Sequence, residues 1–266
     1  MRSFNNKIVW ITGASSGIGA GLARAFAREG AKLILSGRNV SALESMARDC
    51  RSLGADDVML LAFEADAFDQ LDSVVMQAEG WHGRIDVLVN NAGISQRSLV
   101  QDTGLEVYRK IMDIDFFSPV DLTLRVLPGM RSRGEGLIVV TTSVAGKVGS
   151  KLRSGYSAAK HALHGFYDSL RAEVFSQGVE VALLVPGYVK TNVTVNAITA
   201  DGGQQGVRET EHDNSISADD VGLITVRKLK AGHSEILIAS GLPLVATYLK
   251  RFFPRMLVKI LNSQKA

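Results

Sequence analysis

Short apolar runs alternate along the chain with longer stretches in which apolar residues recur every three to four positions. The runs predict strands at residues 7–12, 32–37, 57–63, 86–93, 136–143, 179–187 and 234–240. Most of them are apolar on both faces, which is typical of interior strands in a parallel sheet covered on both sides. The amphipathic stretches predict helices near 17–29, 40–53, 68–80, 105–132, 155–177 and 218–231.

This alternation predicts an α/β fold of the Rossmann type, a doubly wound, mostly parallel seven-stranded sheet with helices on both faces. We expect a single catalytic domain over residues 1–241, because no repeat, low-complexity tract or linker divides it. Residues 188–217 break the rhythm, since they are polar, contain glycine and show no steady period. They follow the carboxyl end of a strand, where ligands bind in open α/β sheets, and we interpret them as a mobile loop that covers the substrate.

Composition supports one large globular domain, with 266 residues, 46% of them hydrophobic, and 5 prolines. A single cysteine, Cys50, excludes an internal disulfide framework and favours a cytoplasmic location. The N-terminal "MRSFNNKIVWITG" is interpreted as a first strand and not as a signal peptide. The net charge of +3 is small for this size, so nucleic acid is not expected as a partner. His82, His161 and His164 lack ligand spacing, so no metal site is expected.

A glycine-rich turn follows the first predicted strand directly. In "TGASSGIG" the three glycines form the pattern G-x-x-x-G-x-G, and a helix is predicted to begin there. Glycine permits a tight turn and close approach of a pyrophosphate, while the helix offers free N–H groups. We therefore predict dinucleotide binding at this turn. The contacting residues would be Gly13, Ser15, Ser16, Gly17, Ile18 and Gly19.

The end of the second predicted strand bears on which dinucleotide binds. A carboxylate there would favour NAD, whereas a cation accommodates the 2′-phosphate of NADP. The chain has Arg38 at this point, beside Ser36 and Asn39, and no acidic residue adjacent in sequence. Because a guanidinium pairs well with phosphate, NADP(H) is favoured over NAD(H), with Arg38 and Asn39 as cofactor contacts. The alternative is a solvated arginine in a loop.

Tyr156 and Lys160 stand four positions apart in a predicted helix, in "YSAAK". Alone, this spacing is also that of an ordinary surface pair. Together with "TGASSGIG", "NNAG" (90–93), "TTSVAG" (141–146) and "PGYVKT" (186–191), however, the chain resembles the short-chain dehydrogenases/reductases over roughly residues 5–240. Within that family it looks most like the lipid- and steroid-handling reductases of the DHRS7 type.

The resemblance implies that Tyr156 is the general acid/base, Lys160 its partner and Ser143 the substrate-orienting residue. The chemistry agrees. A free phenol, with a pKa of about 10, holds its proton too tightly to shuttle it well near neutrality. A neighbouring ammonium favours the phenolate, and would also hold the nicotinamide ribose. A serine hydroxyl can hydrogen-bond the substrate oxygen that Tyr156 protonates.

The resemblance also implies further cofactor contacts. Asp66 and Ala67 would meet the adenine, and a second group would line the central groove and the nicotinamide half. That group consists of Asn91, Ala92, Gly93, Pro186, Gly187, Val189 and Thr191.

The chain departs from the family pattern in "MDIDFFSPV". Asp115 stands where the family usually has an asparagine that holds a water in the proton relay behind the lysine, and Ser118 stands where glycine is common. An ionised aspartate accepts a hydrogen bond but cannot donate one, and its charge opposes the effect of the ammonium on Tyr156. The relay either tolerates an acceptor or is impaired. Pro119 is expected to kink the helix nearby by removing a backbone donor.

Residues 242–266 form an apolar and aromatic C-terminal extension with Lys250, Arg251, Arg255 and Lys259 interspersed. This basic amphipathic segment is compatible with a flank of the substrate pocket, with a subunit contact, or with a location peripheral to a membrane surface. An apolar segment close to the pocket favours a hydrophobic substrate.

The sequence therefore predicts an NADP(H)-dependent oxidoreductase that interconverts a carbonyl and an alcohol, acting on a hydrophobic, lipid- or steroid-like small molecule. The long helices suit a homodimer or homotetramer. One alternative is a catalytically weakened NADP(H)-binding regulatory or scaffold protein on the same fold. Another is a dehydratase or epimerase, which the length of the chain disfavours, because such relatives often carry an extra substrate domain.

Overall fold

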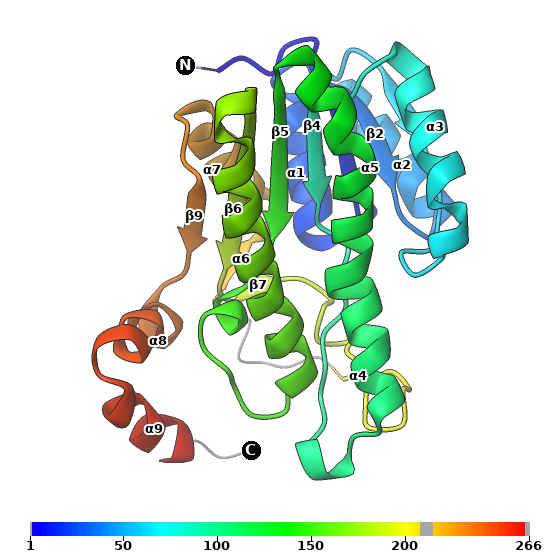
Figure 1. Cartoon of the computed structure of the whole chain (residues 1–266). Helices are drawn as coiled ribbons and strands as arrows, with labels where there is room; N and C mark the ends of the chain where they lie inside the picture. Colours follow the sequence, from blue (N-terminus) through cyan, green and yellow to red (C-terminus); the bar gives the residue numbers. More distant parts are fainter. Residues whose placement is uncertain (1, 208–214, 264–266) are drawn as a thin grey trace.

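Seven parallel strands form the central sheet, in the order β3-β2-β1-β4-β5-β6-β9 (Figure 1). The computed structural model describes residues 2–207 and 215–263. The strands are β1 (Ile8–Thr12), β2 (Lys32–Ser36), β3 (Val58–Leu60), β4 (Val87–Asn90), β5 (Gly136–Thr141), β6 (Val179–Pro186) and β9 (Glu235–Ile238). All seven predicted strands are confirmed. The chain runs outward from β1 to β3 and resumes at β4 on the other side of β1, which leaves a crevice at the carboxyl ends of β1 and β4.

Helices cover both faces of the sheet, because alternate strand residues point to opposite sides. In β1, Val9 and Ile11 join one apolar core, and Ile8 and Trp10 join the other. The first core packs under α1 (Gly17–Ala27), α2 (Val40–Ser52) and α7 (Ala218–Lys230), and the second under α3 (Leu71–His82), α5 (Ser118–Arg133) and α6 (Ser154–Val174). This double burial explains the uninterrupted apolar runs. Short 3₁₀ turns lie at Phe68–Gln70, Val100–Asp102, Val144–Gly146 and Phe175–Gln177.

The long helix predicted at 105–132 is interrupted. It consists of α4 (Leu105–Met112), a π-helical turn η3 (Asp113–Phe117) and α5. Pro119 lies in the first turn of α5, where its missing N–H breaks the regular hydrogen-bond ladder. The carbonyl oxygen of Pro119 accepts hydrogen bonds from Asn90 Nδ2 (3.2 Å) and from the hydroxyl of Tyr167 (2.8 Å). The wider turn carries Asp115 into the interior, where it is fully buried.

Part of the predicted loop at 188–217 is fixed by backbone hydrogen bonds. β7 (Val189–Lys190) pairs with β8 (Ile216–Ser217). The buried residue Ile198 accepts a hydrogen bond from Arg97 N (2.9 Å) and donates one to Ser95 O (2.9 Å). The loop therefore rests on the segment that follows β4. Residues 208–214 of the predicted loop lie outside the described residues.

Two helices complete the described chain, α8 (Gly241–Phe252) and α9 (Pro254–Ser263). Figure 1 shows them, in orange and red, beside the end of the sheet to which the strand arrows point. They are attached through a small apolar cluster of Val148, Ala246 and Leu257, which Leu249 extends. Within the described ranges, none of the helices has the length and apolarity needed to cross a bilayer.

Candidate functional site

The glycine turn after β1 is tight because three parts of the chain meet there. Gly13 has a φ of +66°, and a Cβ on it would lie 2.9 Å from Ala92 Cα. A Cβ on Gly19 would lie 2.1 Å from Gly13 O, which is sterically impossible. A Cβ on Gly17 (φ +53°) would approach Thr191 Cγ2 to 3.2 Å. The predicted motifs at 13–19, 91–93 and 186–191 therefore lie together.

The N-terminus of α1 faces this junction. Ser16 is the residue before the first helical turn, and its side chain makes no capping hydrogen bond. Ser15 reaches toward the end of β2, since its Oγ lies 3.3 Å from the position of a Cβ on Gly37, while Ile18 packs partly buried against the core. An uncapped helix start on a glycine turn is the cradle that a pyrophosphate requires. The residues present thus fit a dinucleotide.

Asn91 fastens the ends of three adjacent strands. Its Nδ2 donates to Thr12 O (3.1 Å), and its Oδ1 accepts from Thr141 Oγ1 (3.1 Å). The backbone N–H groups of Asn91 and Ala92 both donate to Thr12 Oγ1 at 3.0 Å. Neither threonine is among the predicted site residues, because a threonine at a strand end carries no distinctive sequence signal. Together they fix the floor of the predicted cofactor groove.

The end of β6 closes the other side of the groove. Pro186 ends the strand, and Gly187 N donates to Ile238 O at 2.8 Å, which ties the turn to β9. Val189, the first residue of β7, is buried in the first apolar core, so its side chain supports this wall of the groove from below. Thr191 is half-buried against Gly17, as described above.

The end of β2 presents the predicted NADP determinant. Arg38 is 66% exposed, and its Nε lies 3.8 Å from Glu64 Oε2. The sequence around Arg38 holds no acid, but the fold brings one from the segment after β3. Asn39 has a structural task, because its Oδ1 accepts from Ala42 N (3.0 Å) and caps α2. Asp66 is exposed and Ala67 is half-buried, and both lie between Glu64 and the 3₁₀ turn at Phe68–Gln70 in the chain.

Tyr156 and Lys160 lie one turn apart near the start of α6. Tyr156 is half-buried, and Lys160 is buried. The ammonium of Lys160 lies 5.6 Å from the centroid of the Tyr156 ring. It also donates a hydrogen bond to Thr141 O (3.2 Å) at the end of β5. The pair is therefore not a solvated surface pair, since the fold points the cation inward beside the phenol.

Asp115 is the counter-charge of Lys160. Its Oδ2 lies 3.2 Å from Lys160 Nζ, while its Oδ1 accepts from Ile94 N at 2.8 Å. Burial raises the pKa of the Asp115 carboxyl, and the charge of Lys160 opposes this only in part. Burial alone would lower the pKa of Lys160, but attraction to Asp115 and to Tyr156 raises it above its usual value. Gly93 lies against the same carboxylate, because a Cβ there would be 3.3 Å from both oxygens.

A residue absent from the predicted site, Gln96, holds the start of α6. Its fully buried Oε1 accepts from Gly155 N (2.7 Å) and approaches Tyr156 N (3.4 Å). Its Nε2 donates to Ser98 Oγ at 3.0 Å. Gln96 therefore positions the turn that carries Tyr156. A lone glutamine in an apparent loop gave no signal of this contact in the sequence.

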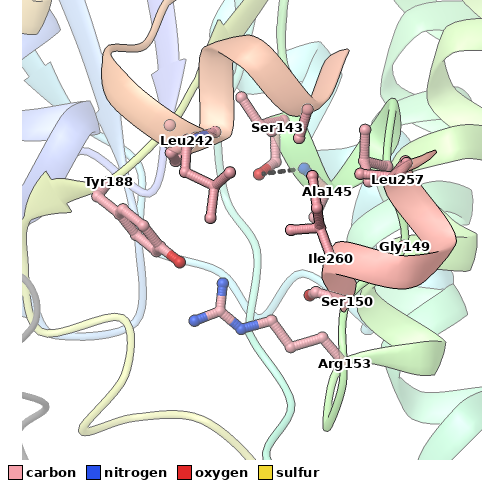
Figure 2. Close-up of a pocket in the computed structure, with 14 residues that line it drawn as sticks. Ser143, Ala145, Gly149, Ser150, Arg153, Tyr188, Leu242, Leu257 and Ile260 are labelled. Carbon is pink, nitrogen blue, oxygen red and sulfur yellow. Dashed lines mark hydrogen bonds between the residues drawn. The ribbon is translucent and has the colours of Figure 1, made fainter. Parts of the chain in front are cut away.

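Ser143 follows β5 and lines a pocket at the carboxyl ends of the strands (Figure 2). Its Oγ accepts from Ala145 N (3.1 Å), which fixes the hydroxyl side chain at the start of the turn Val144–Gly146. The opposite wall is apolar and comes from α8 and α9, with Leu242, Ala246, Leu257 and Ile260. Figure 2 shows the side chains of Tyr188 and Arg153 extending toward one another across the opening. An apolar chamber thus adjoins the hydroxyl of Ser143.

Comparisons with solved structures agree with this architecture. The chain superimposes on a short chain dehydrogenase/reductase from Burkholderia phymatum in complex with NAD, with a TM-score of 0.84, 23% identity and 96% of both chains covered. It also superimposes on an alcohol dehydrogenase from Thermococcus sibiricus complexed with 5-hydroxy-NADP, with a TM-score of 0.75, 25% identity, and 88% of this chain and 96% of the other covered.

Sequence comparisons reach further. The chain is 37% identical to dehydrogenase/reductase SDR family member 7B of Rattus norvegicus, over 97% of this chain and 81% of the relative. It is 36% identical to the Danio rerio protein of the same name, over 98% and 86%. A model of the short chain dehydrogenase family matches residues 7–201. With this match, the fold and the agreement of motif with geometry, the chain belongs to the short-chain dehydrogenase/reductase family.

Proposed function

We propose that this oxidoreductase interconverts a hydrophobic ketone and its alcohol with NADP(H), using Tyr156 as the general acid/base. The observation that carries the proposal is the buried ammonium of Lys160, held 5.6 Å from the centroid of the Tyr156 ring. A buried cation beside a phenol favours the phenolate form. A cation–π contact by itself would stabilise the pair only modestly, whereas a proton-transferring tyrosine gains directly from a neighbouring cation that favours its phenolate.

The cofactor groove has places for each part of a nicotinamide dinucleotide. The glycine turn and the uncapped start of α1 would hold the pyrophosphate. Asn91 to Gly93 would line the middle, Asp66 and Ala67 would meet the adenine, and the segment from Pro186 to Thr191 would hold the nicotinamide half. Lys160 would contact the nicotinamide ribose. When bound, the cofactor supplies or accepts the hydride.

The proton is handled by the side chains of the chain itself. In reduction, Tyr156 donates its hydroxyl proton to the carbonyl oxygen as negative charge develops there. Ser143, fixed by its hydrogen bond from Ala145 N (3.1 Å), orients and stabilises the same oxygen. Lys160 stabilises the resulting phenolate of Tyr156 until a proton returns. In oxidation, the phenolate accepts the alcohol proton and the sequence runs in reverse.

NADP is favoured over NAD by Arg38, whose exposed guanidinium at the end of β2 can pair with a 2′-phosphate. Glu64, 3.8 Å away, would release Arg38 when the phosphate arrives, because an exposed ion pair of this length is weak. A hydrophobic substrate is favoured by the apolar wall of Leu242, Ala246 and Leu257 near Ser143.

A specific observation also supports the alternative, a catalytically weakened NADP(H)-binding regulator. The carboxylate of Asp115 lies 3.2 Å from Lys160 Nζ and neutralises part of the field that would act on Tyr156. The two functions differ in turnover and not in cofactor binding. The regulator would bind NADPH and leave every carbonyl compound unchanged.

The test combines cofactor binding and turnover. Purified protein is titrated into NADPH and NADH while nicotinamide fluorescence is followed, and NADPH oxidation is then measured with a panel of hydrophobic ketones. We expect tighter binding of NADPH and turnover of at least one ketone. Tyr156→Phe should lower kcat at least a hundredfold with NADPH binding intact, and exposed Tyr248→Phe serves as the matched control. Unchanged turnover in Tyr156→Phe would refute the mechanism.

A further inference from the structure

The outward faces of α8 and α9 are apolar although they are exposed to solvent. In α8, Leu242, Val245, Tyr248 and Phe252 recur at helical spacing, and they are between 46% and 68% exposed. The stripe continues into the α8–α9 junction and α9. We call the whole set the C-terminal apolar face. It consists of Leu242, Val245, Tyr248, Phe252, Phe253, Met256 and Val258.

This face is surrounded by positive charge. Lys250, Arg251, Arg255 and Lys259 are exposed on the same two helices. No aspartate or glutamate follows Glu235 in the sequence, so nothing acidic balances these cations within α8 or α9. Aromatic and aliphatic side chains beside unbalanced cations are the composition of a helix that lies in the interface of an anionic bilayer.

A second copy of the chain fits this face poorly. In a two-fold symmetric contact the same patch meets itself, so the four cations of one copy would lie against the four of the other. Such like-charge contacts are unfavourable when solvent is excluded. An anionic lipid surface satisfies both features at once, because headgroups pair with the cations while the acyl boundary receives the apolar side chains.

We propose that the C-terminal apolar face docks on an anionic lipid bilayer, with α8 and α9 lying in the plane of the interface. The cluster of Val148, Ala246 and Leu257 anchors the two helices to the domain from their inner side. In Figure 1 they stand clear of the helix layers, at the end of the sheet toward which the strands point. Docking there would bring that edge of the sheet close to the lipid.

The docking surface and the pocket share the same two helices. Leu242 is common to both, because it lines the pocket in Figure 2 and is 46% exposed, while Leu257 and Ile260 form the wall contributed by α9. A hydrophobic ketone would therefore reach the pocket beside Ser143 from the bilayer side. This last step rests on the proposed function, whereas docking itself does not depend on catalysis.

Docking is tested by co-sedimentation of the full chain with vesicles, without cofactor or substrate. One set of vesicles is phosphatidylcholine alone, and the other contains about a third phosphatidylglycerol. We expect the protein to sediment with the anionic vesicles, and at least tenfold less with the neutral ones or at high salt. Absence of sedimentation with anionic vesicles would overturn the proposal.

Two variants locate the contact. Phe252→Ser/Phe253→Ser/Met256→Ser removes apolar side chains, and Arg251→Gln/Arg255→Gln removes two charges. Each should weaken binding at least tenfold, and about thirtyfold for the charge pair. The controls change residues elsewhere that are also exposed, Met76→Ser/Phe175→Ser (74% and 84% exposed) for the apolar set and Arg48→Gln/Arg131→Gln for the charges. Controls that lose binding as much as the variants would overturn the assignment to this face.

A protein occupant would give a different result. If the face instead joins two copies, the wild type fails to bind anionic vesicles, and Phe252→Ser/Phe253→Ser/Met256→Ser halves the mass measured by sedimentation equilibrium. That outcome overturns lipid docking. NADPH binding and turnover of a water-soluble ketone are measured in parallel, so loss of the proposed activity is recognised separately from loss of vesicle binding. Thermal melting confirms that each variant is folded.

Discussion

The Oδ2 atom of Asp115 lies 3.2 Å from the ammonium of Lys160, and the two side chains are 0% and 5% exposed. The π-helical turn at Asp113–Phe117 and the start of α6 thus meet in one buried ion pair behind Tyr156. A buried pair stabilises a fold only modestly relative to apolar packing, but removal of one partner leaves a charge uncompensated. The pair therefore links the start of α6, which carries Tyr156, to the rest of the fold.

Replacement of Asp115 by asparagine tests whether the negative charge hinders catalysis. In the wild type, Ile94 N donates to Asp115 Oδ1 at 2.8 Å. The amide oxygen of asparagine can still accept this hydrogen bond, and the side chain keeps nearly the same shape. We expect kcat in Asp115→Asn to stay within about tenfold of the wild type, since the proposed proton relay requires an acceptor at this position and asparagine supplies one. Steady-state kinetics with NADPH and a hydrophobic ketone measure this.

A rise in kcat far above tenfold would instead mean that the native carboxylate suppresses proton transfer, which would favour a regulatory function. The control is Asp115→Ala, which keeps neither acceptor nor charge. It should lower the free energy of unfolding by about 3–5 kcal/mol, because Lys160 then stays buried with neither a counter-charge nor an acceptor at position 115. Urea unfolding at neutral pH measures the difference.

Gln96 should act as a positioning residue for Tyr156. Gln96→Met removes the acceptor of Gly155 N (2.7 Å) but retains most of the side-chain volume. We expect kcat to fall about ten- to a hundredfold while KM for NADPH changes little, because a small misplacement of a reacting group slows the chemical step. Gln96→Glu restores an acceptor at a helix N-terminus, where negative charge is tolerated, and should recover part of the rate. Equal losses in both variants would contradict the positioning role.

Arg38 and Glu64 should affect cofactor preference in opposite directions. Arg38→Gln removes the cation that would pair with the 2′-phosphate, so the Kd for NADPH should rise at least tenfold while the Kd for NADH stays within about threefold. Glu64→Gln removes the carboxylate 3.8 Å from Arg38 and should tighten NADPH binding modestly. Fluorescence titration of both cofactors gives the four constants. A parallel loss of both cofactors in Arg38→Gln would show that Arg38 does not select the phosphate.

His164 should make the fold less stable in mild acid. Burial lowers its pKa from 6.5 to about 4, with Lys147 adding to the effect, and the nearby Glu235 and Asp168 oppose it. Between these two pH values the unfolded chain binds a proton that the folded chain excludes, so stability present above pH 6.5 is lost as the pH falls toward 4.

His164→Leu should remove this part of the acid sensitivity, as measured by urea unfolding at about pH 7 and pH 5. His233→Leu is the control, because His233 is exposed. If wild type and His164→Leu lose the same stability between the two pH values, His164 is not the group responsible.

The sequence was most informative where hydrophobic patterning and turn residues alone determine the local structure. Double-sided apolar runs predicted all seven strands, and the glycine spacing located the turn where a Cβ on Gly19 would lie 2.1 Å from Gly13 O. The position of Asp115 was also recognisable, because it interrupts a family motif. The ion pair between Asp115 and Lys160 could not be predicted, because it depends on a π-helical turn that the hydrophobic periodicity of the sequence does not indicate.

The features of the site that the sequence did not reveal depend on contacts between segments that are distant in the chain. Glu64 reaches Arg38 only because β3 lies beside β2, so a scan of neighbours in sequence could not find it. Nothing in the residue types of Gln96 and Thr12 distinguishes them in the sequence. Their importance comes from the backbone groups that they bind, at the start of α6 and after β4 respectively. The C-terminal segment was recognised from the sequence as basic and amphipathic. Its division into α8 and α9, and the contribution of both helices to the pocket wall beside Ser143, could be seen only in the structure.

One backbone contact joins the loop predicted to cover the substrate to the helix that carries Tyr156. Gln96 forms a β-bridge with Ile198 of that loop, and its side chain accepts a hydrogen bond from the first turn of α6. A displacement of that loop would therefore also displace the side chain that supports the backbone of Tyr156, the proposed proton donor. On the proposed function, a change in this loop would alter specificity and rate together, and a loop transplanted from a homologue would have to supply its own partner for position 96 to keep Tyr156 aligned.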